Sequence, residues 1–165
     1  PNLSWAEAYS ASKAGNFTGW RIGAIVGSPD FIDDIATIKG NSDSGFVAPM
    51  AAGILATFEE NRNQIEEVRN MYQRRIQLLT KTLKASGMQL AVEPAAGFFT
   101  LWKSPSRAFG QKMENAEMFN KEMIRRTGVV GVHFNPYIRY AVCGDVEAMI
   151  NPINDALAKA AVSYD

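Results

Sequence analysis

The sequence is poor in the residues from which many catalytic and structural sites are built. Its 165 residues include one cysteine, Cys143, and one histidine, His133. A single cysteine cannot form a disulfide or a cysteine-based metal site within the chain. One histidine poorly supplies a zinc site or a serine–histidine–aspartate triad. We therefore expect no metal.

Long apolar runs and an excess of charge of one sign are also missing. No apolar segment approaches the roughly 18 residues of a membrane-spanning helix, and the first residues do not show the basic-then-apolar pattern of a signal peptide. The 17 basic and 17 acidic residues balance, which argues against a nucleic-acid or anionic-membrane partner. A composition of 47% apolar and 21% charged residues is typical of a soluble globular protein. We expect it to be cytoplasmic.

The chain begins with Pro1 rather than methionine, and its densest motif follows within a few residues. Chain termini are the least ordered parts of most domains. We therefore expect the sequence to be a fragment, the C-terminal portion of a longer protein.

The first part of the chain reads as one edge of a sheet with its loops. Residues 22–27, IGAIVG, predict a short buried strand. A helix is expected over residues 30–38, a polar loop over 39–45, and a second helix over 49–60.

A longer helix is predicted over residues 63–85. Its apolar residues recur at spacings of three and four and form one stripe: Ile65, Val68, Tyr72, Ile76, Leu79 and Leu83. At 1.5 Å per residue it is roughly 35 Å long, enough to bridge two domains, and Gly87 ends it as a left-handed cap.

The rest of the chain alternates strands and helices. Strands are expected at residues 88–94, 97–104, 129–132 and 137–143, and helices at 115–127 and 145–162. We predict an α/β chain in which residues 1–61 end a larger domain, and residues 62–165 form the long helix and a small α+β domain.

Lys13 stands among small and hydroxyl-bearing residues. A lysine amine can form a Schiff base with pyridoxal phosphate, and this cofactor needs hydroxyls, accessible backbone N–H groups and a guanidinium around its phosphate. Ser10, Ser12 and Arg21 supply such groups. The simpler reading is a solvated lysine on a loop.

The string SASKAGNFTGWRIG, residues 10–23, favours the first reading. It resembles the Schiff-base segment of fold-type-I pyridoxal-phosphate enzymes, specifically the class I/II aminotransferases. The resemblance implies that Lys13 binds the cofactor and then moves the substrate proton. It also implies that Ser10, perhaps with Ser12, and Arg21 hold the phosphate; an arginine fork suits phosphate oxygens.

Three further segments resemble the same family. The loop GNSDSGF looks like that of the subgroup containing the LL-diaminopimelate, alanine and aspartate aminotransferases. There it reaches the neighbouring subunit of a dimer, so Ser42, Asp43 and Ser44 are cross-subunit candidates; an ordinary polar turn is equally compatible. EPAAGFF resembles a strand of the small domain, in which Phe98 and Phe99 are expected in the core.

YIRYAVC, residues 137–143, resembles the strand whose arginine binds the substrate carboxylate. This resemblance assigns that role to Arg139, with a structural ion pair as the alternative. In many relatives a longer loop precedes this strand, whereas here only HFNP, residues 133–136, stands there. His133 is either a substrate contact in that gap or a histidine at a strand end.

The resemblance implies an aminotransferase that moves an amino group between an amino acid and a 2-oxo acid, as a homodimer. The family's partners for the cofactor ring lie upstream of the lysine, and Glu7 and Tyr9 are too near Lys13 to replace them. We therefore expect the isolated chain to be inactive. The alternatives are a C–S or β-lyase, a decarboxylase, or a non-catalytic effector domain of a transcription regulator.

Overall fold

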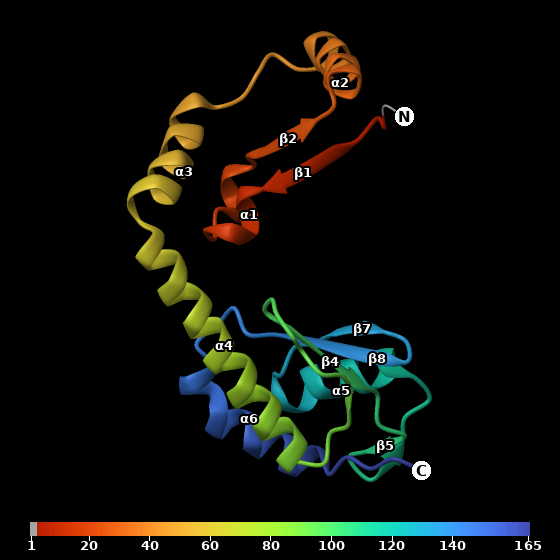
Figure 1. Ribbon diagram of the computed structural model, residues 1–165. Coiled ribbons are helices and arrows are strands. Elements are labelled where there is room, and N and C mark those ends of the chain that lie inside the picture. The colour runs from red at the N-terminus through yellow and green to blue at the C-terminus, as the bar shows by residue number, and fades with distance from the viewer. Residues whose placement is uncertain (1–2) are drawn as a thin grey trace. The chain divides into compact units, whose positions relative to one another are not determined.

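The structure is a computed structural model that describes residues 3–165 (Figure 1). The chain divides into two compact units between Glu67 and Val68. This division falls within the longest helix, α4, which spans Arg62–Ala85 and matches the helix predicted over 63–85. Helices and strands mix in both units, which confirms the predicted α/β class. That residues 1–61 belong to a larger cofactor-binding domain stays a prediction.

The first unit is built on two antiparallel strands. Strand β1, Ala6–Ser10, pairs along its whole length with β2, Gly23–Gly27. A short helix, α1, Ala11–Ala14, and a 3-10 turn, Thr18–Trp20, occupy the connection between them. The pairing of Ser10 with Gly23 closes the base of this connection. All candidate cofactor residues therefore belong to one loop held by a β-ladder.

Strand β2 is exposed, whereas the sequence predicts it to be buried. Ile25 and Val26 are 46% and 52% exposed. Within the described residues, β2 belongs to a two-stranded sheet with β1. A run of β-branched residues favours a strand, but the run does not specify what covers its faces. Sequence analysis also missed β1, because AEAYS has only one large apolar side chain.

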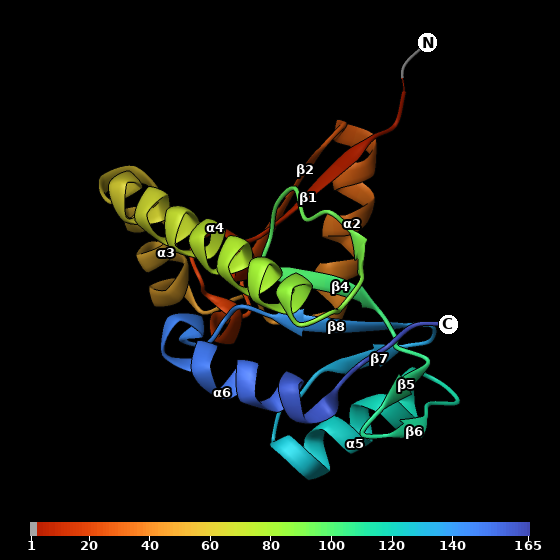
Figure 2. The same ribbon diagram turned by 90° about the horizontal axis from the view of Figure 1, so that it is seen from below.

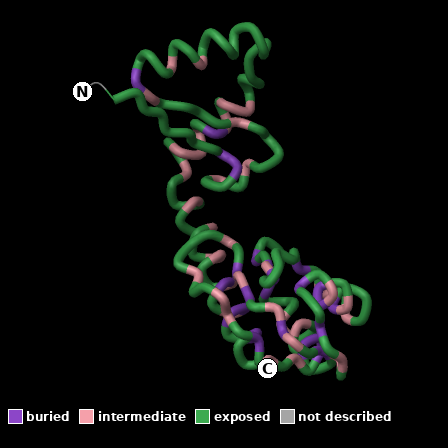
Figure 3. Tube along the Cα trace, turned by 90° about the vertical axis from the view of Figure 1, so that its right-hand side faces the viewer, coloured by how far each residue is buried: buried purple, intermediate pink, exposed green. Residues whose placement is uncertain are grey.

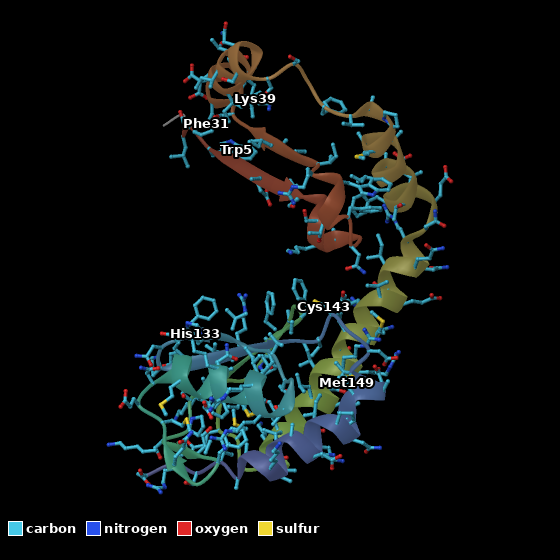
Figure 4. The ribbon with its side chains drawn as sticks, turned by 180° about the vertical axis from the view of Figure 1, so that it is seen from behind. Trp5, Phe31, Lys39, His133, Cys143 and Met149 are labelled. Carbon is cyan, nitrogen blue, oxygen red and sulfur yellow. The ribbon has the colours of Figure 1, made fainter. Side chains whose placement is uncertain are left out.

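Two helices complete the first unit, and the first is longer than predicted. Helix α2 spans Pro29–Ser42 and α3 spans Ala48–Glu60. Residues 39–42 were expected in a loop, but their polar side chains stabilise a helix end instead. The Asn41 amide donates to the Thr37 carbonyl at 2.8 Å, and the Ser42 hydroxyl donates to the Ile38 carbonyl at 2.8 Å. Lys39, labelled in Figure 4, pairs with Asp43 one turn on.

The second unit contains a four-stranded antiparallel sheet. Its strands are β3, Leu90–Val92; β4, Phe99–Lys103; β8, Tyr137–Ala141; and β7, Val132–Phe134, in that spatial order. The strand predicted at 129–132 lies two to three residues later, because residues 135–136 form the turn of the β7–β8 hairpin. A small hairpin, β5, Arg107–Ala108, and β6, Gln111–Lys112, follows β4.

One face of this sheet packs against three helices. Helix α4 is joined by α5, Ala116–Thr127, and α6, Val146–Ala160. Along β4 and β8 the buried residues alternate with exposed ones, as expected for a sheet covered on one side. Figure 2 shows α5 and α6 on one side of β4, β7 and β8, and Figure 3 shows buried residues concentrated in this unit. Trp102, Phe119, Met123 and Ile138 are fully buried at its centre.

Helix ends follow the expected capping rules. Asp145 caps α6 by accepting a hydrogen bond from the Ala148 N–H, and Asn115 caps α5 through the Met118 N–H. Gly87 and Gly128 follow α4 and α5 with left-handed φ angles of 87° and 75°. Across residues 3–165, no helix combines the length and apolar character needed to cross a bilayer.

Asn120 joins α5 to the segment before β7. Its amide donates to the Gly131 carbonyl at 3.0 Å and accepts from the Gly131 N–H at 3.1 Å. Both residues are buried, so these two hydrogen bonds satisfy backbone groups that water does not reach.

We predict that Asn120→Ala lowers the free energy of unfolding by about 2–4 kcal/mol, because it leaves the buried Gly131 N–H and carbonyl without partners. Urea denaturation followed by circular dichroism measures the change. Asn154→Ala, an exposed asparagine on α6, is the matched control and is expected to change stability by less than about 0.5 kcal/mol. Equal effects of the two substitutions would contradict this account.

Candidate functional site

Lys13 lies in the connection between β1 and β2, in the short helix α1. Its side chain is exposed, whereas Ser12 beside it is buried. Ser10 precedes the helix, and its hydroxyl accepts a hydrogen bond from the Ser12 N–H at 3.3 Å. The lysine is therefore presented on a turn whose start is fixed by Ser10.

Arg21 closes the same connection from the other side. Its guanidinium donates to the Thr18 carbonyl at 2.9 Å, and the Thr18 hydroxyl donates to the Ser12 carbonyl at 3.1 Å. The Ala11 N–H also donates to the Ile22 carbonyl at 3.1 Å. These hydrogen bonds join the segment Thr18–Arg21 to the short helix that carries Lys13. The structure thus brings Ser10, Ser12, Lys13 and Arg21 together in one loop.

Backbone strain marks Arg21. Its φ of 54° lies in the left-handed region, which costs a residue with a Cβ about 1–2 kcal/mol. Strain of this kind persists where surrounding structure enforces it, and it clusters at functional sites.

Two of the three glycines in the motif, Gly19 and Gly23, differ in their surroundings. A Cβ at Gly23 would lie 2.6 Å from the Tyr9 carbonyl oxygen, so the β1–β2 ladder itself requires glycine there. A Cβ at Gly19 would meet no described atom within 4 Å. Packing within the described chain therefore accounts for Gly23 and leaves open space beside Gly19.

Two pKa values are shifted in strand β1 and at the start of α2. The Glu7 carboxylate, by hydrogen bonding and by its charge, raises the pKa of Tyr9. The hydroxyls of Ser28 and Ser4 lower the pKa of Asp30 by hydrogen bonding to its carboxylate. Neither group belongs to the Lys13 loop.

The cross-subunit candidates lie at the end of α2. Ser42 is its last residue, and Asp43 pairs with Lys39. Ser44 lies in the following loop, and all three residues are exposed. Their assignment to a neighbouring subunit's site stays a prediction.

Arg139 lies on β8 in the second unit, on the sheet face away from the helices. Its strand neighbours Ile138 and Tyr140 point into the core, whereas Arg139 is half-buried on the opposite face. The guanidinium carbon lies 4.1 Å from the centre of the Phe99 ring and 5.0 Å from that of Phe134. Both rings are diagonal cross-strand neighbours, because Leu101 and Val132 lie directly opposite the arginine.

These two rings hold the guanidinium without neutralising its charge. In the described part of the chain, no carboxylate forms an ion pair with Arg139, so the structural ion pair considered as an alternative is not present there. A cation stacked on aromatic rings keeps its N–H edges available to an anion. The arrangement leaves the guanidinium able to pair with a carboxylate or a phosphate, and the assignment of Arg139 to a substrate stays a prediction.

The sequence analysis did not predict that Phe99 and Phe134 stack on Arg139. Phe99 was expected in the core, but it is 39% exposed and stacks on Arg139. The period-2 alternation of FTLWK was the available signal: with Trp102 in the core, Phe99 and Leu101 must face the other way.

His133 lies on the other face of the sheet from Arg139. It pairs directly with Ile138, and directly opposed residues share a face. Its positive form lowers the pKa of Glu117 on α5, after the larger effect of Lys121. This pairing favours a histidine at a strand end over a contact to a ligand on Arg139. Figure 4 labels His133 in the second unit.

Comparison with known proteins identifies the class. The sequence profile of the aminotransferase class I and II family matches residues 2–149. The chain therefore belongs to this family, as its motifs predict.

Among its relatives are LL-diaminopimelate aminotransferases. That of Methanocaldococcus jannaschii is 35% identical over 141 residues, which is 83% of this chain and 33% of the relative. That of Syntrophobacter fumaroxidans is 33% identical over 149 residues, 86% of this chain and 36% of the relative. The chain thus spans about a third of the length of the curated relatives it matches.

Solved structures show the same fold. The aspartate aminotransferase from Rhizobium meliloti superposes with a TM-score of 0.78 at 22% identity, over 94% of this chain and 41% of that one. An aminotransferase from Staphylococcus aureus gives 0.76 at 20% identity, over 94% and 42%. The fold is therefore that of the C-terminal portion of an aminotransferase.

Proposed function

We propose that the protein containing this chain transfers an amino group between an amino acid and a 2-oxo acid, with pyridoxal phosphate bound to Lys13. The observation that carries the proposal is the hydrogen-bonded loop that joins Ser10, Ser12, Lys13 and Arg21 within a chain of this family.

The loop suits the cofactor's phosphate and aldehyde. Ser10 offers a hydroxyl. Among residues 3–165, the Arg21 guanidinium donates to the Thr18 carbonyl, and a Cβ at Gly19 would meet no atom within 4 Å. Arg21 and Ser10 would hold the phosphate, and the Lys13 amine would hold the aldehyde. When bound, the cofactor supplies the electron sink that makes the substrate Cα–H acidic.

Lys13 has a second role in this proposal. The Lys13 amine would also accept and return the proton at the substrate Cα. Its exposed position on a short, anchored turn leaves it room to do so.

Arg139 would bind the substrate carboxylate. Its fork pairs with both carboxylate oxygens, and the Phe99 and Phe134 rings limit where the fork can point. LL-diaminopimelate is the first substrate to test, because several relatives carry its name. The exposed segment of Ser42, Asp43 and Ser44 would meet a second subunit in a homodimer.

Lys13→Ala is expected to abolish covalent cofactor binding. Incubation with pyridoxal phosphate followed by borohydride should fix the cofactor mass on the peptide that contains Lys13, and the visible absorbance of the bound cofactor should be missing in the variant. The longest protein that contains this sequence is tested beside the 165-residue chain. Lys39→Ala, in the same unit but on α2, is the control, and labelling that persists in Lys13→Ala would refute the assignment.

Arg139→Ala is expected to raise KM for the amino acid about 30- to 1,000-fold, because a lost charge-paired contact costs about 2–4 kcal/mol. Cofactor affinity should stay nearly unchanged. The KM of Arg139→Lys should lie between those of the unaltered protein and Arg139→Ala, because lysine keeps the charge but lacks the two-pronged guanidinium. Lys103→Ala removes a cation from the same sheet face and should change KM less than about twofold. An equal effect of the alanine substitutions at 103 and 139 would refute a specific role for Arg139.

The reaction type is tested by its products. Amino transfer requires a 2-oxo acid acceptor and conserves the amino group, so product formation should stop when the acceptor is omitted. Ammonia with pyruvate would indicate a lyase, carbon dioxide a decarboxylase, and cofactor binding without turnover a non-catalytic effector domain.

A further inference from the structure

The indole ring of Trp20 is held between a second ring and a helix. Trp20 is the residue directly before Arg21. Its ring centre lies 4.7 Å from that of Phe17, with the ring planes tilted by 45°, which is a favourable aromatic pair. Its outer edge lies against Gly53 on α3: a Cβ at that glycine would lie 2.9 Å from the Trp20 Cζ3 atom and 3.0 Å from its Cη2 atom. The ring therefore occupies the space that a side chain at position 53 would need.

Backbone conformation does not explain the glycine at position 53. Gly53 lies inside α3 and is not among the glycines with a left-handed φ. In a helix interior glycine is less favourable than alanine, because it loses more conformational freedom on folding. What the position requires is room for Trp20. A second glycine serves the same pair of rings, since a Cβ at Gly15, whose φ is −132°, would overlap the Phe17 ring.

These contacts fix one end of the segment that carries Arg21. Besides its contact with α3, Trp20 donates its backbone N–H to the Phe17 carbonyl at 3.0 Å. On the other side of the arginine, the Ile22 carbonyl accepts from the Ala11 N–H at 3.1 Å. A left-handed φ of 54° costs free energy and persists where neighbouring structure enforces it. The residues before and after Arg21 supply that enforcement.

We propose that Trp20, seated on Gly53, is a positioning residue for Arg21. It holds the left-handed turn from which the guanidinium reaches the cofactor phosphate. The proposal rests on the phosphate-binding role proposed above for Arg21 and adds the contact that keeps the arginine in place. A backbone that is fixed before a ligand arrives loses less entropy on binding. Trp20 and Gly53 act through Arg21 in this role, without touching the cofactor.

Gly53→Ala tests this role, because its added methyl group must displace the Trp20 ring. Gly40→Ala is the matched control: Gly40 lies in α2, and a Cβ there would meet no described atom within 4 Å. Both substitutions favour a helix, but only the first disturbs the ring. In NMR spectra of the 165-residue chain, Gly53→Ala should shift the Trp20 indole N–H signal. It should also shift the Arg21 Cα and Cβ signals, which report the φ of the arginine, whereas Gly40→Ala should leave all three unchanged.

Cofactor binding supplies a second measurement, made on the longest protein that contains this sequence. Pyridoxal lacks the phosphate group of pyridoxal phosphate, so the ratio of the two affinities reports the contribution of the phosphate. This ratio should fall about five- to tenfold in Gly53→Ala, because a displaced guanidinium loses part of a charge-assisted hydrogen bond. It should change less than about twofold in Gly40→Ala. A general loss of folded protein would lower both affinities together and leave the ratio unchanged.

Trp20→Phe should rescue the alanine substitution. The phenylalanine ring is shorter and leaves room for a methyl group at position 53, so the two substitutions are expected to be non-additive. The double variant Trp20→Phe, Gly53→Ala should recover at least about threefold of the affinity ratio that Gly53→Ala loses.

Three results would overturn the role of Trp20 while leaving the proposed function in place: equal affinity ratios in the two glycine variants, unchanged Arg21 signals in Gly53→Ala, or a double variant no better than Gly53→Ala. A different result would refute the phosphate role of Arg21 itself, and this inference with it. That result is an unaltered protein that binds pyridoxal phosphate no more tightly than pyridoxal.

Discussion

The second unit depends on the pairing of β4 with β8. Side chains alternate between the two faces of a strand, so this one ladder sends Trp102 and Ile138 into the core and leaves Phe99 and Arg139 on the other side. The apolar face anchors the sheet against three helices, and the same anchoring fixes the arginine between its rings. A shift in register by one residue would exchange the two faces. The packing of the core and the position of Arg139 are thus set by the same constraint.

In the first unit, a single β-ladder likewise fixes the position of a loop. The β1–β2 ladder ends at Ser10 and Gly23, and every candidate cofactor group follows within the closed connection. Hydrogen bonds through Thr18 join its two turns. The exposed lysine is therefore carried by a backbone that is held at both ends.

Sequence patterns predicted the second unit better than the first. The long stripe of α4, the caps of α5 and α6 and the strands β4 and β8 all follow from local periodicity and capping residues, which the sequence states directly. The structure of the first unit depends on contacts between segments that are distant in sequence. A short stretch of sequence does not say which strand pairs with β2 or what covers that strand. Polar residues at the end of α2 looked like loop formers, although their side chains bond back to helix carbonyls. Resemblance to the family's motifs pointed to Lys13, Arg21 and Arg139 as candidates. The aromatic rings that stack on Arg139 could be placed only from the cross-strand register.

The left-handed backbone of Arg21 places two requirements on one residue. Glycine would adopt its φ of 54° without the cost that a Cβ brings, but glycine has no guanidinium. Replacing Arg21 with glycine would relieve this backbone cost, and it would also remove the guanidinium that the proposed phosphate binding requires. A substitution chosen for stability alone would therefore oppose the function proposed for this loop.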